Sequence, residues 1–389
     1  MKVLFLMNTG FQTTSKHLLV SVIESLRANG NEVVVVKKEL SEDETTILEL
    51  EKLGVKVLSV KTTSPKKTNL IFRYLSELKF FKKCKKYIPN NFDSVFLQSS
   101  NVAMSAVKVI KSKNTKARIV FNVQDIFPYN AVYGGKLKSN GLIFKTLAKL
   151  QRKAYNAVDK IITISEDMKD TLIADGVLSS KIEVVYNWSY QDSVYDYNKI
   201  DFTNVSKIIN KGYFNVVYAG NIGVMQNVDV IIETASLLKE DNRIWFYIIG
   251  NGVYRNKLEL IAKERGIKNV TFTSMLNSQD APSIYASADL NVIPLEKGVY
   301  KTALPSKTAT CIACQKPIVF CVGKECKFAK FVEDNNACKV LDSRDAVGLK
   351  DEILSLLKNS NSCDNSNLYQ TYFSKTNNSK KYVDIICGQ

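Results

Sequence analysis

Short apolar runs alternate along the chain with helix-length amphipathic segments. In the first half the runs lie at 3–8, 32–37, 55–60, 94–99, 118–123, 160–165 and 182–187. In the second half they recur at 213–220, 243–250, 269–274, 289–295, 316–322 and 337–342. Several of the intervening segments end at glycine, which is common at helix C-termini. This alternation predicts two α/β domains, each a doubly wound parallel sheet with helices on both faces.

The pattern breaks once in the middle of the chain. Residues 188–212 are polar and rich in Tyr, Asp and Asn, which indicates a linker. With 389 residues the chain also exceeds one typical core. We therefore expect an N-terminal domain at 1–187 and a C-terminal domain at 213–365. A tail at 366–389 offers a last helix that we expect to pack back on the first domain.

Two loops of the second domain carry paired glycines directly after predicted strands. Gly220 and Gly223 follow the first strand, and Gly250 and Gly252 follow the second. Because glycine has no Cβ, the backbone there can approach a ligand closely, although glycine also ends strands for purely steric reasons. Neither loop reads G-x-G-x-x-G, so the dehydrogenase fingerprint is absent.

A third loop of this domain has the sequence LPSKTATCIACQKPIV. Pro305 is suited to the first position of a helix, so we predict a helix from Ser306 to about Cys314. The amides of that helix start and the charge of Lys307 would favour a phosphate group. The alternative is an ordinary strand-loop-helix corner with a solvated lysine.

The net charge of +16 is concentrated in two N-terminal segments. Residues 61–90 hold nine Lys or Arg against the single acid Glu77, and residues 136–160 hold seven against Asp159. The concentration favours an anionic partner for this surface. Neither segment carries an RNA- or DNA-binding signature, so we expect no nucleic-acid partner.

The N-terminal apolar run is too short for a signal peptide or a membrane span. Eight cysteines lie mostly in apolar runs, and the chain has one histidine, His17, so the sequence does not favour a zinc site. We interpret the cysteines as reduced thiols of a cytoplasmic protein.

Five motifs follow one another along nearly the whole chain. They are QDIFP (124–128), AYNAVDKIITISEDMKDTL (154–172), KIEVVYNW (181–188), YAGNIGVMQNVD (218–229) and LPSKTATCIACQKPIV (304–319). Together they resemble the retaining glycosyltransferases of family 4, and more closely the WbuB-like bacterial branch of O-antigen and capsule synthesis. The resemblance implies a GT-B fold, with two Rossmann-like domains facing a cleft. It also implies sugar transfer from a nucleotide diphosphate, expected to be UDP, to a lipid-diphosphate-linked sugar.

This chain has neutral residues at several positions where other family members have charged ones. The two family glutamates, of which the second binds the nucleotide ribose, fall at Thr302 and Thr310, and Glu296 is an out-of-register candidate. The Arg and Lys that many members aim at the diphosphate fall at Asn221 and Gln226.

The resemblance implies site residues at matching positions. The predicted donor-binding residues are Gly220, Asn221, Gly223, Gln226, Gly250, Gly252, Arg255, Met275, Leu276, Lys301, Thr302, Ser306, Thr308 and Thr310. Lys307 is a catalytic candidate, because a cation beside the leaving phosphate stabilises the charge that grows there. No general base is needed if the leaving phosphate takes the acceptor proton. No cofactor and no metal is expected, because the second domain has no Asp-x-Asp at a strand end to hold Mg²⁺.

Asp125 is the second catalytic candidate. It follows a strand directly and would orient the acceptor or a sugar hydroxyl, or alternatively cap the next turn. The predicted acceptor-binding residues are Gly10, Gln124 and Asn187. Gln124 stands where the wider family has histidine.

The segment KKTNLIFRYLSELKFFKKCKK (66–86) predicts a membrane-binding helix. Its expected packed seam consists of Ile71, Tyr74, Leu75, Leu78 and Phe81. The side chains expected at an anionic bilayer are Phe72, Arg73, Lys79, Phe80, Lys82 and Lys83. We therefore expect a peripheral enzyme on the inner face of the cell membrane. The alternatives are a solvated basic face, a basic peripheral protein without transfer activity, or a catalytically impaired partner subunit, which the missing glutamates allow.

Overall fold

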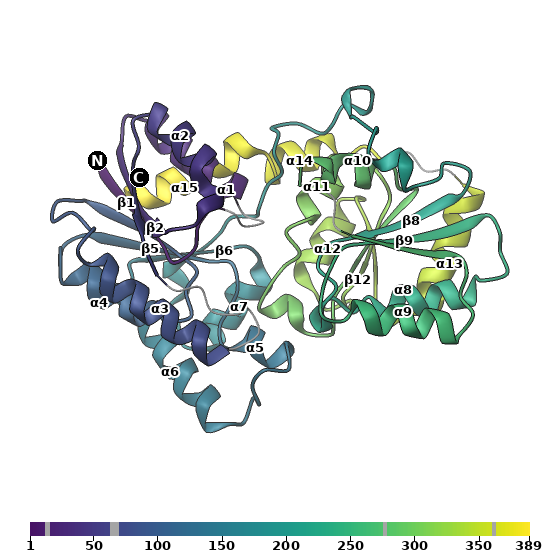
Figure 1. Ribbon diagram of the computed structural model, residues 1–389, viewed down its shortest axis with the longest axis horizontal. Coiled ribbons are helices and arrows are strands. Elements are labelled where there is room, and N and C mark those ends of the chain that lie inside the picture. Colours follow the sequence, from purple (N-terminus) through teal and green to yellow (C-terminus); the bar gives the residue numbers. More distant parts are fainter. Residues whose placement is uncertain (12–15, 63–69, 275–277, 360–362) are drawn as a thin grey trace. The chain divides into compact units, whose positions relative to one another are not determined.

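The computed structural model describes residues 1–11, 16–62, 70–274, 278–359 and 363–389 (Figure 1). The chain divides into two compact units. The first comprises Met1–Asn187, Thr302–Leu304 and Lys375–Gln389, and the second comprises Trp188–Lys301 and Pro305–Ser374. Each unit has one parallel sheet.

The first sheet has the strand order β3-β2-β1-β4-β5-β6-β7. Its strands are β1 (Lys2–Met7), β2 (Glu32–Lys38), β3 (Lys56–Val60), β4 (Ser94–Gln98), β5 (Arg118–Val123), β6 (Lys160–Thr163) and β7 (Ile182–Val184). The order reverses between β1 and β4, and ligands of such sheets bind beyond the carboxyl ends of the strands near that point.

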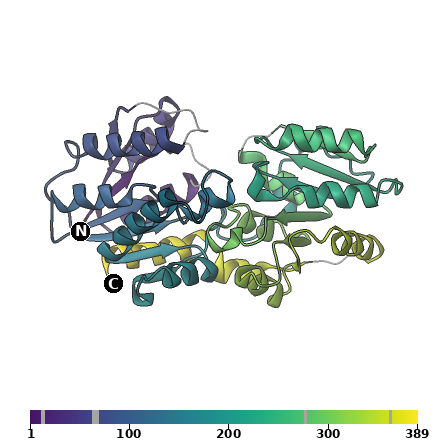
Figure 2. The same ribbon diagram turned by 90° about the horizontal axis from the view of Figure 1, so that it is seen from below.

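Helices cover both faces of this sheet (Figures 1 and 2). They are α1 (Lys16–Ala28), α2 (Glu44–Lys52), α3 (Leu70–Cys84), α4 (Ala103–Lys111), α5 (Tyr129–Tyr133), α6 (Leu142–Ala157), α7 (Glu166–Ala174) and α15 (Lys375–Cys387). Side chains of α3, α4 and α6 join those of the strands in one buried core. On the other face α15 lies beside α1, and its Tyr382 ring contacts Phe96 of β4 at a tilt, with ring centroids 6.1 Å apart.

The second sheet has the strand order β10-β9-β8-β11-β12-β13. Its strands are β8 (Phe214–Ala219), β9 (Ile244–Ile249), β10 (Val270–Thr273), β11 (Leu290–Pro294), β12 (Ile318–Cys321) and β13 (Lys339–Leu341). Its helices are α8 (Asp229–Leu237), α9 (Arg255–Glu264), α10 (Ala281–Ala286), α11 (Thr308–Ala313), α12 (Lys327–Asp334), α13 (Ala346–Lys358) and α14 (Ser366–Tyr372). The reversal point lies between β8 and β11.

Every apolar run singled out in the sequence forms a strand, with ends that shift by a few residues. The central strands of each sheet are buried on both faces, which explains their continuous apolar character. Residues 188–212, expected as a linker, belong to the second unit and begin with the buried Trp188. The tail divides: α14 belongs to the second unit, and α15 belongs to the first.

Candidate functional site

The two glycine-bearing loops of the second unit contact each other at the carboxyl ends of β8 and β9. The Ile222 N–H donates to the Asn251 carbonyl at 2.9 Å. A Cβ atom on Gly250 would lie 1.9 Å from the Gly220 carbonyl oxygen, and one on Gly252 would lie 2.0 Å from that of Ile222. Loop packing therefore requires glycine at 250 and 252. The sequence predicts both glycines at the donor, with a purely steric role as the alternative.

Gly223 has different surroundings. Its backbone is extended, with φ −115°. A Cβ atom there would meet only side-chain ends, Gln226 Oε1 at 2.7 Å and Asn221 Nδ2 at 2.9 Å. Those two amides bind each other, with Asn221 Nδ2 donating to Gln226 Oε1 at 2.9 Å. The loop thus carries neutral amide groups beside its second glycine.

Lys307 extends from the start of α11 to the first glycine loop. Its Nζ donates to the Ala219 carbonyl at 2.9 Å and lies 3.6 Å from the centroid of the Tyr218 ring. A Cβ atom on Gly220 would be 3.2 Å from the same Nζ. Burial lowers the pKa of Lys307 to about 7. The structure therefore brings together the predicted lysine and the predicted loop, which the sequence places almost ninety residues apart.

The predicted start of α11 is wrong by two residues. The helix begins at Thr308, and Lys307 is its N-cap residue in place of an interior position. The Thr308 hydroxyl donates to the Pro305 carbonyl at 2.9 Å. Thr310 is buried, and its hydroxyl is 3.0 Å from that of Ser189. Thr308 and Thr310, two of the three threonines predicted at the donor, therefore stabilise the helix start and its packing within the second unit.

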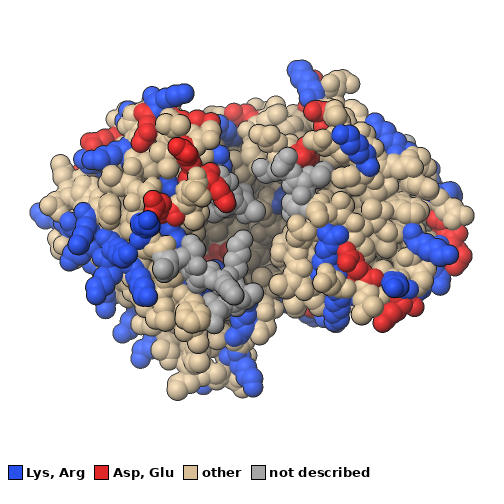
Figure 3. Space-filling model, viewed as in Figure 1, with Lys and Arg blue, Asp and Glu red and all other residues tan. Residues whose placement is uncertain are grey.

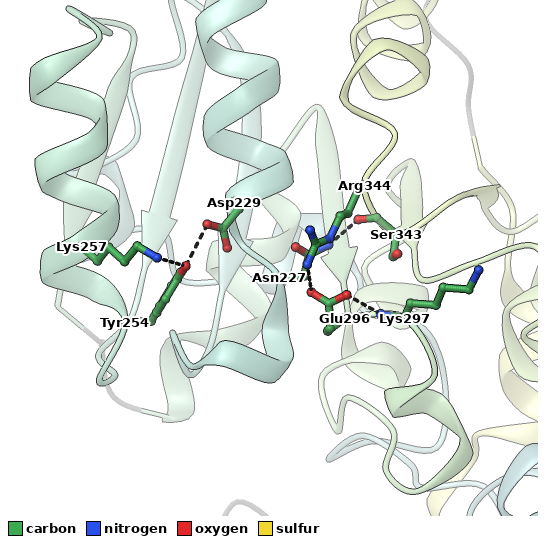
Figure 4. A network of polar contacts seen from close by, with 8 residues as sticks. All are labelled: Asn227, Asp229, Tyr254, Lys257, Glu296, Lys297, Ser343 and Arg344. Atoms are coloured by element: carbon green, nitrogen blue, oxygen red, sulfur yellow. Dashed lines mark hydrogen bonds and ion pairs between the residues drawn. The ribbon is translucent and has the colours of Figure 1, made fainter. Parts of the chain in front are cut away.

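A network of polar contacts braces the first glycine loop (Figure 4). Asn227 has a left-handed backbone, with φ 46°, and its amide donates to the Ser343 carbonyl after β13. The Glu296 N–H donates to the Met225 carbonyl at 2.9 Å. The Glu296 carboxylate pairs with Arg344 at 2.8 Å. Glu296, the out-of-register ribose candidate, thus belongs to a bracing ion pair at the rim of a polar pocket after β11 to β13.

Helix α9 begins with a second set of polar contacts. Arg255 Nε pairs with Glu259 at 2.7 Å. The Glu259 carboxylate therefore offsets the positive charge of Arg255, which was predicted to bind the donor. In Figure 4 Lys257 donates to the Tyr254 hydroxyl at 2.7 Å, and that hydroxyl donates to Asp229 at 3.2 Å. These contacts connect α9 to the first turn of α8.

Four predicted donor residues remain. Lys301 and Ser306 are exposed in the loops before α11. Met275 and Leu276 lie outside the described residues.

In the first unit, neutral amides connect the carboxyl ends of the strands. Asn187 Nδ2 donates to Gln124 Oε1 at 2.8 Å, and Gln124 Nε2 donates to Asn122 Oδ1 at 3.1 Å. Asn122 Nδ2 donates to Gln98 Oε1 at 2.8 Å, and the Tyr382 hydroxyl donates to Asn122 Oδ1 at 3.1 Å. Two predicted acceptor residues, Gln124 and Asn187, are therefore joined through a network that sequence reasoning had not found.

Asp125 follows β5 and forms an isolated antiparallel bridge with Ala303. The next N–H, that of Ile126, donates to the carbonyl of the buried Thr302 at 2.8 Å. Desolvation by the surrounding protein raises the pKa of Asp125 to about 6, and the charge of Arg73 opposes that shift. Arg73, predicted to face a membrane, thus lies close enough to Asp125 to influence its charge.

Gly10 lies against a buried ion pair. Lys37 Nζ is 2.6 Å from Asp43 Oδ2, and both side chains are fully buried. Asp43 Oδ1 accepts from the Phe11 N–H at 2.9 Å, and a Cβ atom on Gly10 would lie 2.3 Å from Asp43 Oδ2. This pair holds the loop after β1 in place. Neither Lys37 nor Asp43 had been singled out, since their pairing depends on the fold of the β2 to α2 connection.

The predicted orientation of α3 is wrong at three positions. Phe80, expected at the membrane, is 1% exposed and contacts Phe81 in the core. Ile71 and Leu75, expected in the packed seam, are 69% and 45% exposed. The buried stripe follows Ser76, Phe80 and Cys84 at a spacing of four, which rotates the helix away from the predicted seam. Phe72, Arg73, Lys79, Lys82 and Lys83 are exposed as predicted.

Helix α6 offers a second exposed apolar and basic surface. Leu142 and Ile143 are 80% and 65% exposed at its first turn. Lys145 and Lys149 are exposed on the following turns. Figure 3 shows Lys and Arg side chains gathered on the part of the first unit where α3, α4 and α6 lie. No helix of the described residues is long and apolar enough to cross a membrane.

Comparison with known proteins identifies both halves of the chain. The family model described as Glycosyltransferase Family 4 matches residues 17–188. The model described as Glycosyl transferases group 1 matches residues 200–370.

Two curated relatives match parts of the chain. WcaI of Escherichia coli (strain K12), named as a glycosyl transferase of colanic acid biosynthesis, is 29% identical over 215 residues, which cover 52% of this chain and 50% of WcaI. WbjE of Pseudomonas aeruginosa, named as a glycosyltransferase, is 26% identical over 243 residues, which cover 61% of this chain and 60% of WbjE. The chain thus matches half to three fifths of the length of these relatives.

Solved structures share the fold over the whole chain. Anabaena HepE in complex with UDP and glucose has a TM-score of 0.76 at 14% identity, and the match covers 100% of both chains. WaaG, a glycosyltransferase involved in lipopolysaccharide biosynthesis, has a TM-score of 0.66 at 16% identity, again over 100% of both chains. The likeness to these structures is one of fold.

Proposed function

Since this chain belongs to the family 4-like glycosyltransferases with the GT-B fold, we propose that it transfers a sugar from a nucleotide diphosphate to a saccharide acceptor in cell-surface polysaccharide synthesis. UDP is the nucleotide we propose, because HepE binds UDP and UDP-glucose in the same fold. The acceptor we propose is a lipid-diphosphate-linked sugar, of the kind used for capsule or O-antigen chains.

The observation that carries the proposal is the position of Lys307. A cation lies 2.9 Å from the carbonyl at the end of β8, beside a glycine loop and near the reversal point of the sheet. That is where doubly wound sheets bind phosphates. The lysine supplies the positive charge that Asn221 and Gln226 lack, and Arg255 is already paired with Glu259.

We propose retention of configuration at the transferred sugar. As the bond from sugar to phosphate breaks, negative charge grows on the leaving phosphate oxygen, and the Lys307 ammonium stabilises it. The leaving phosphate then takes the proton of the attacking hydroxyl, so no further base is needed. Asp125 orients the acceptor hydroxyl, with Gln124 and Asn187 as its neutral neighbours.

Lys307→Ala tests this assignment. It removes a charge-assisted contact of about 2 kcal/mol, so we expect kcat/KM to fall roughly 30-fold, mostly in kcat. Lys324→Ala is the matched control, since Lys324 is an exposed lysine of the same unit. Equal kcat/KM for Lys307→Ala and the control would exclude Lys307 from the diphosphate site. Absence of transfer by the unaltered chain with all common UDP-sugars would favour the alternative, a catalytically impaired partner subunit.

We also propose that transfer needs no metal ion, because the second domain has no Asp-x-Asp at a strand end. Turnover in excess EDTA should equal turnover with added Mg²⁺ or Mn²⁺. Loss of activity in EDTA, restored by Mn²⁺, would contradict this.

A further inference from the structure

Tyr218 contacts both parts of the proposed donor site, the lysine and the glycine loop. We infer that it is a positioning residue for the donor diphosphate: its ring holds the Lys307 cation, and its hydroxyl holds the loop at 220–223. The inference rests on the proposed function, because it concerns how the same site binds the same group.

Tyr218 makes one contact through its ring and another through its hydroxyl. Its ring centroid is 3.6 Å from Lys307 Nζ, so the ammonium lies on the ring face. Its hydroxyl donates to the Asn221 carbonyl at 2.5 Å. The side chain is 1% exposed, so neither contact competes with water. One rigid ring therefore fixes the distance between the cation and the loop backbone.

A shared carbonyl holds the lysine from the other side. The Ala219 carbonyl accepts from Lys307 Nζ at 2.9 Å and from the Tyr285 hydroxyl at 3.3 Å. The Lys307 ammonium thus has a carbonyl and an aromatic face as partners, both of which favour the charged form. A diphosphate beside Gly220 would add the negative charge that these neutral partners do not supply.

The titratable groups around Lys307 in the described part of the chain are neutral at pH 7. Burial raises the pKa of Tyr218 and of Tyr285, and it raises the pKa of Cys311 to about 12. Burial lowers the pKa of Lys307 itself to about 7. Above pH 7 the free protein therefore holds a mostly neutral lysine. Binding of a diphosphate favours the ammonium, so binding takes up a proton.

The measurement is the affinity for UDP by calorimetry between pH 7 and 9, where the phosphates of UDP stay ionised. In the unaltered protein the Kd should rise with pH by up to about 10-fold per unit, because one proton is taken up on binding. Lys307→Met should bind UDP more weakly and without this pH dependence.

Two substitutions separate the roles of the Tyr218 ring and its hydroxyl. Tyr218→Phe keeps the ring, so the pH dependence should persist while the Kd rises a few-fold through the loosened loop. Tyr218→Leu opens the lysine to water, so the pH dependence should move above pH 9, and the Kd at pH 7 should rise roughly 2- to 30-fold. When Lys307→Met is already present, adding Tyr218→Leu should raise the Kd for UDP no more than adding Tyr218→Phe does.

The inference is overturned if Tyr218→Leu keeps the pH dependence and the Kd of the unaltered protein. If Tyr218→Leu does not fold, the test rests on Tyr218→Phe alone. Loss of the pH dependence of the Kd in Tyr218→Phe, which keeps the ring, would overturn the role of the ring. Normal UDP binding by Lys307→Met would instead refute the proposed diphosphate site itself. Dependence of the Kd on Lys307 but not on Tyr218 would refute only the inference.

Discussion

Two glycines of the second unit illustrate how one residue type serves two purposes. Gly250 is confined by the Gly220 carbonyl and by its φ of +157°. Gly223 has an extended backbone and meets only flexible amide ends. The first is required by the fold, and the second is free to serve a ligand.

Alanine at each position separates these purposes. Gly250→Ala should lower the free energy of unfolding by about 1–3 kcal/mol or more, because the backbone must move. Gly223→Ala should change that free energy by less than about 1 kcal/mol while weakening UDP binding several-fold. Urea unfolding and calorimetry measure the two effects. If both substitutions lowered the free energy of unfolding equally, Gly223 would have a purely structural role.

The raised pKa of Asp125 predicts how kcat depends on pH. Its pKa is raised to about 6, so the carboxylate becomes protonated as pH falls through 6, well above the usual range for aspartate. If the carboxylate orients the acceptor, kcat should decrease as pH drops through about 6. Asp125→Asn should have a lower kcat that does not change over this range. A profile of the unaltered enzyme that stays level from pH 7 to 5 would contradict the role.

At the scale of single elements, α3 and α6 combine exposed apolar side chains with lysines. Each helix exposes two adjacent large apolar side chains, Ile71 and Phe72 on α3 and Leu142 and Ile143 on α6. We propose that these two helices bind the headgroup layer of an anionic membrane, which would bring a lipid-linked acceptor to the enzyme.

The α6 variant Leu142→Ser, Ile143→Ser, Lys145→Glu and Lys149→Glu tests this. Each basic residue near an anionic surface contributes about 1 kcal/mol, so binding to phosphatidylglycerol vesicles should fall at least 10-fold. UDP affinity should not change. Leu260→Ser with Lys263→Glu on α9 of the second unit is the matched control, with the same kinds of exposed side chain. Cosedimentation equal to that of the control would rule out α6 as the membrane surface.

At the scale of the whole molecule, the chain ends in the unit where it began. Helix α15 buries Tyr382, Val383 and Ile386 in the first unit, and the Ile386 carbonyl accepts from Ser94 Oγ at 2.8 Å. The last helix is therefore a structural part of the first unit, and its tyrosine orients Asn122 in the amide network.

Ending the chain after Ser374 should destabilise only the first unit. Three buried apolar side chains are lost, each worth about 2 kcal/mol, and the apolar faces of α1 and β4 become exposed. Hydrogen exchange should then accelerate in β1, β4 and β5, while β8 and β9 keep their protection. Uniform loss of protection in both sheets would mean that the units do not unfold independently.

From the sequence alone one can predict the strands, their grouping into two sheets, and the placement of Lys307 and Gly220 at one site. Buried parallel strands require continuous apolar runs, and loops after neighbouring strands must meet at the same edge of the sheet. Which side chains pair there depends on the folded arrangement of the loops and could not be predicted. Tyr218 lies under Lys307 and Asn227 contacts Ser343, because the strand order brings residues that are distant in the sequence together. Lys37 pairs with Asp43, six residues later, because of the path of the connection from β2 to α2. The orientation predicted for α3 is wrong for the same reason, since the helix carries apolar residues on more than one side and only packing against the sheet selects the buried one.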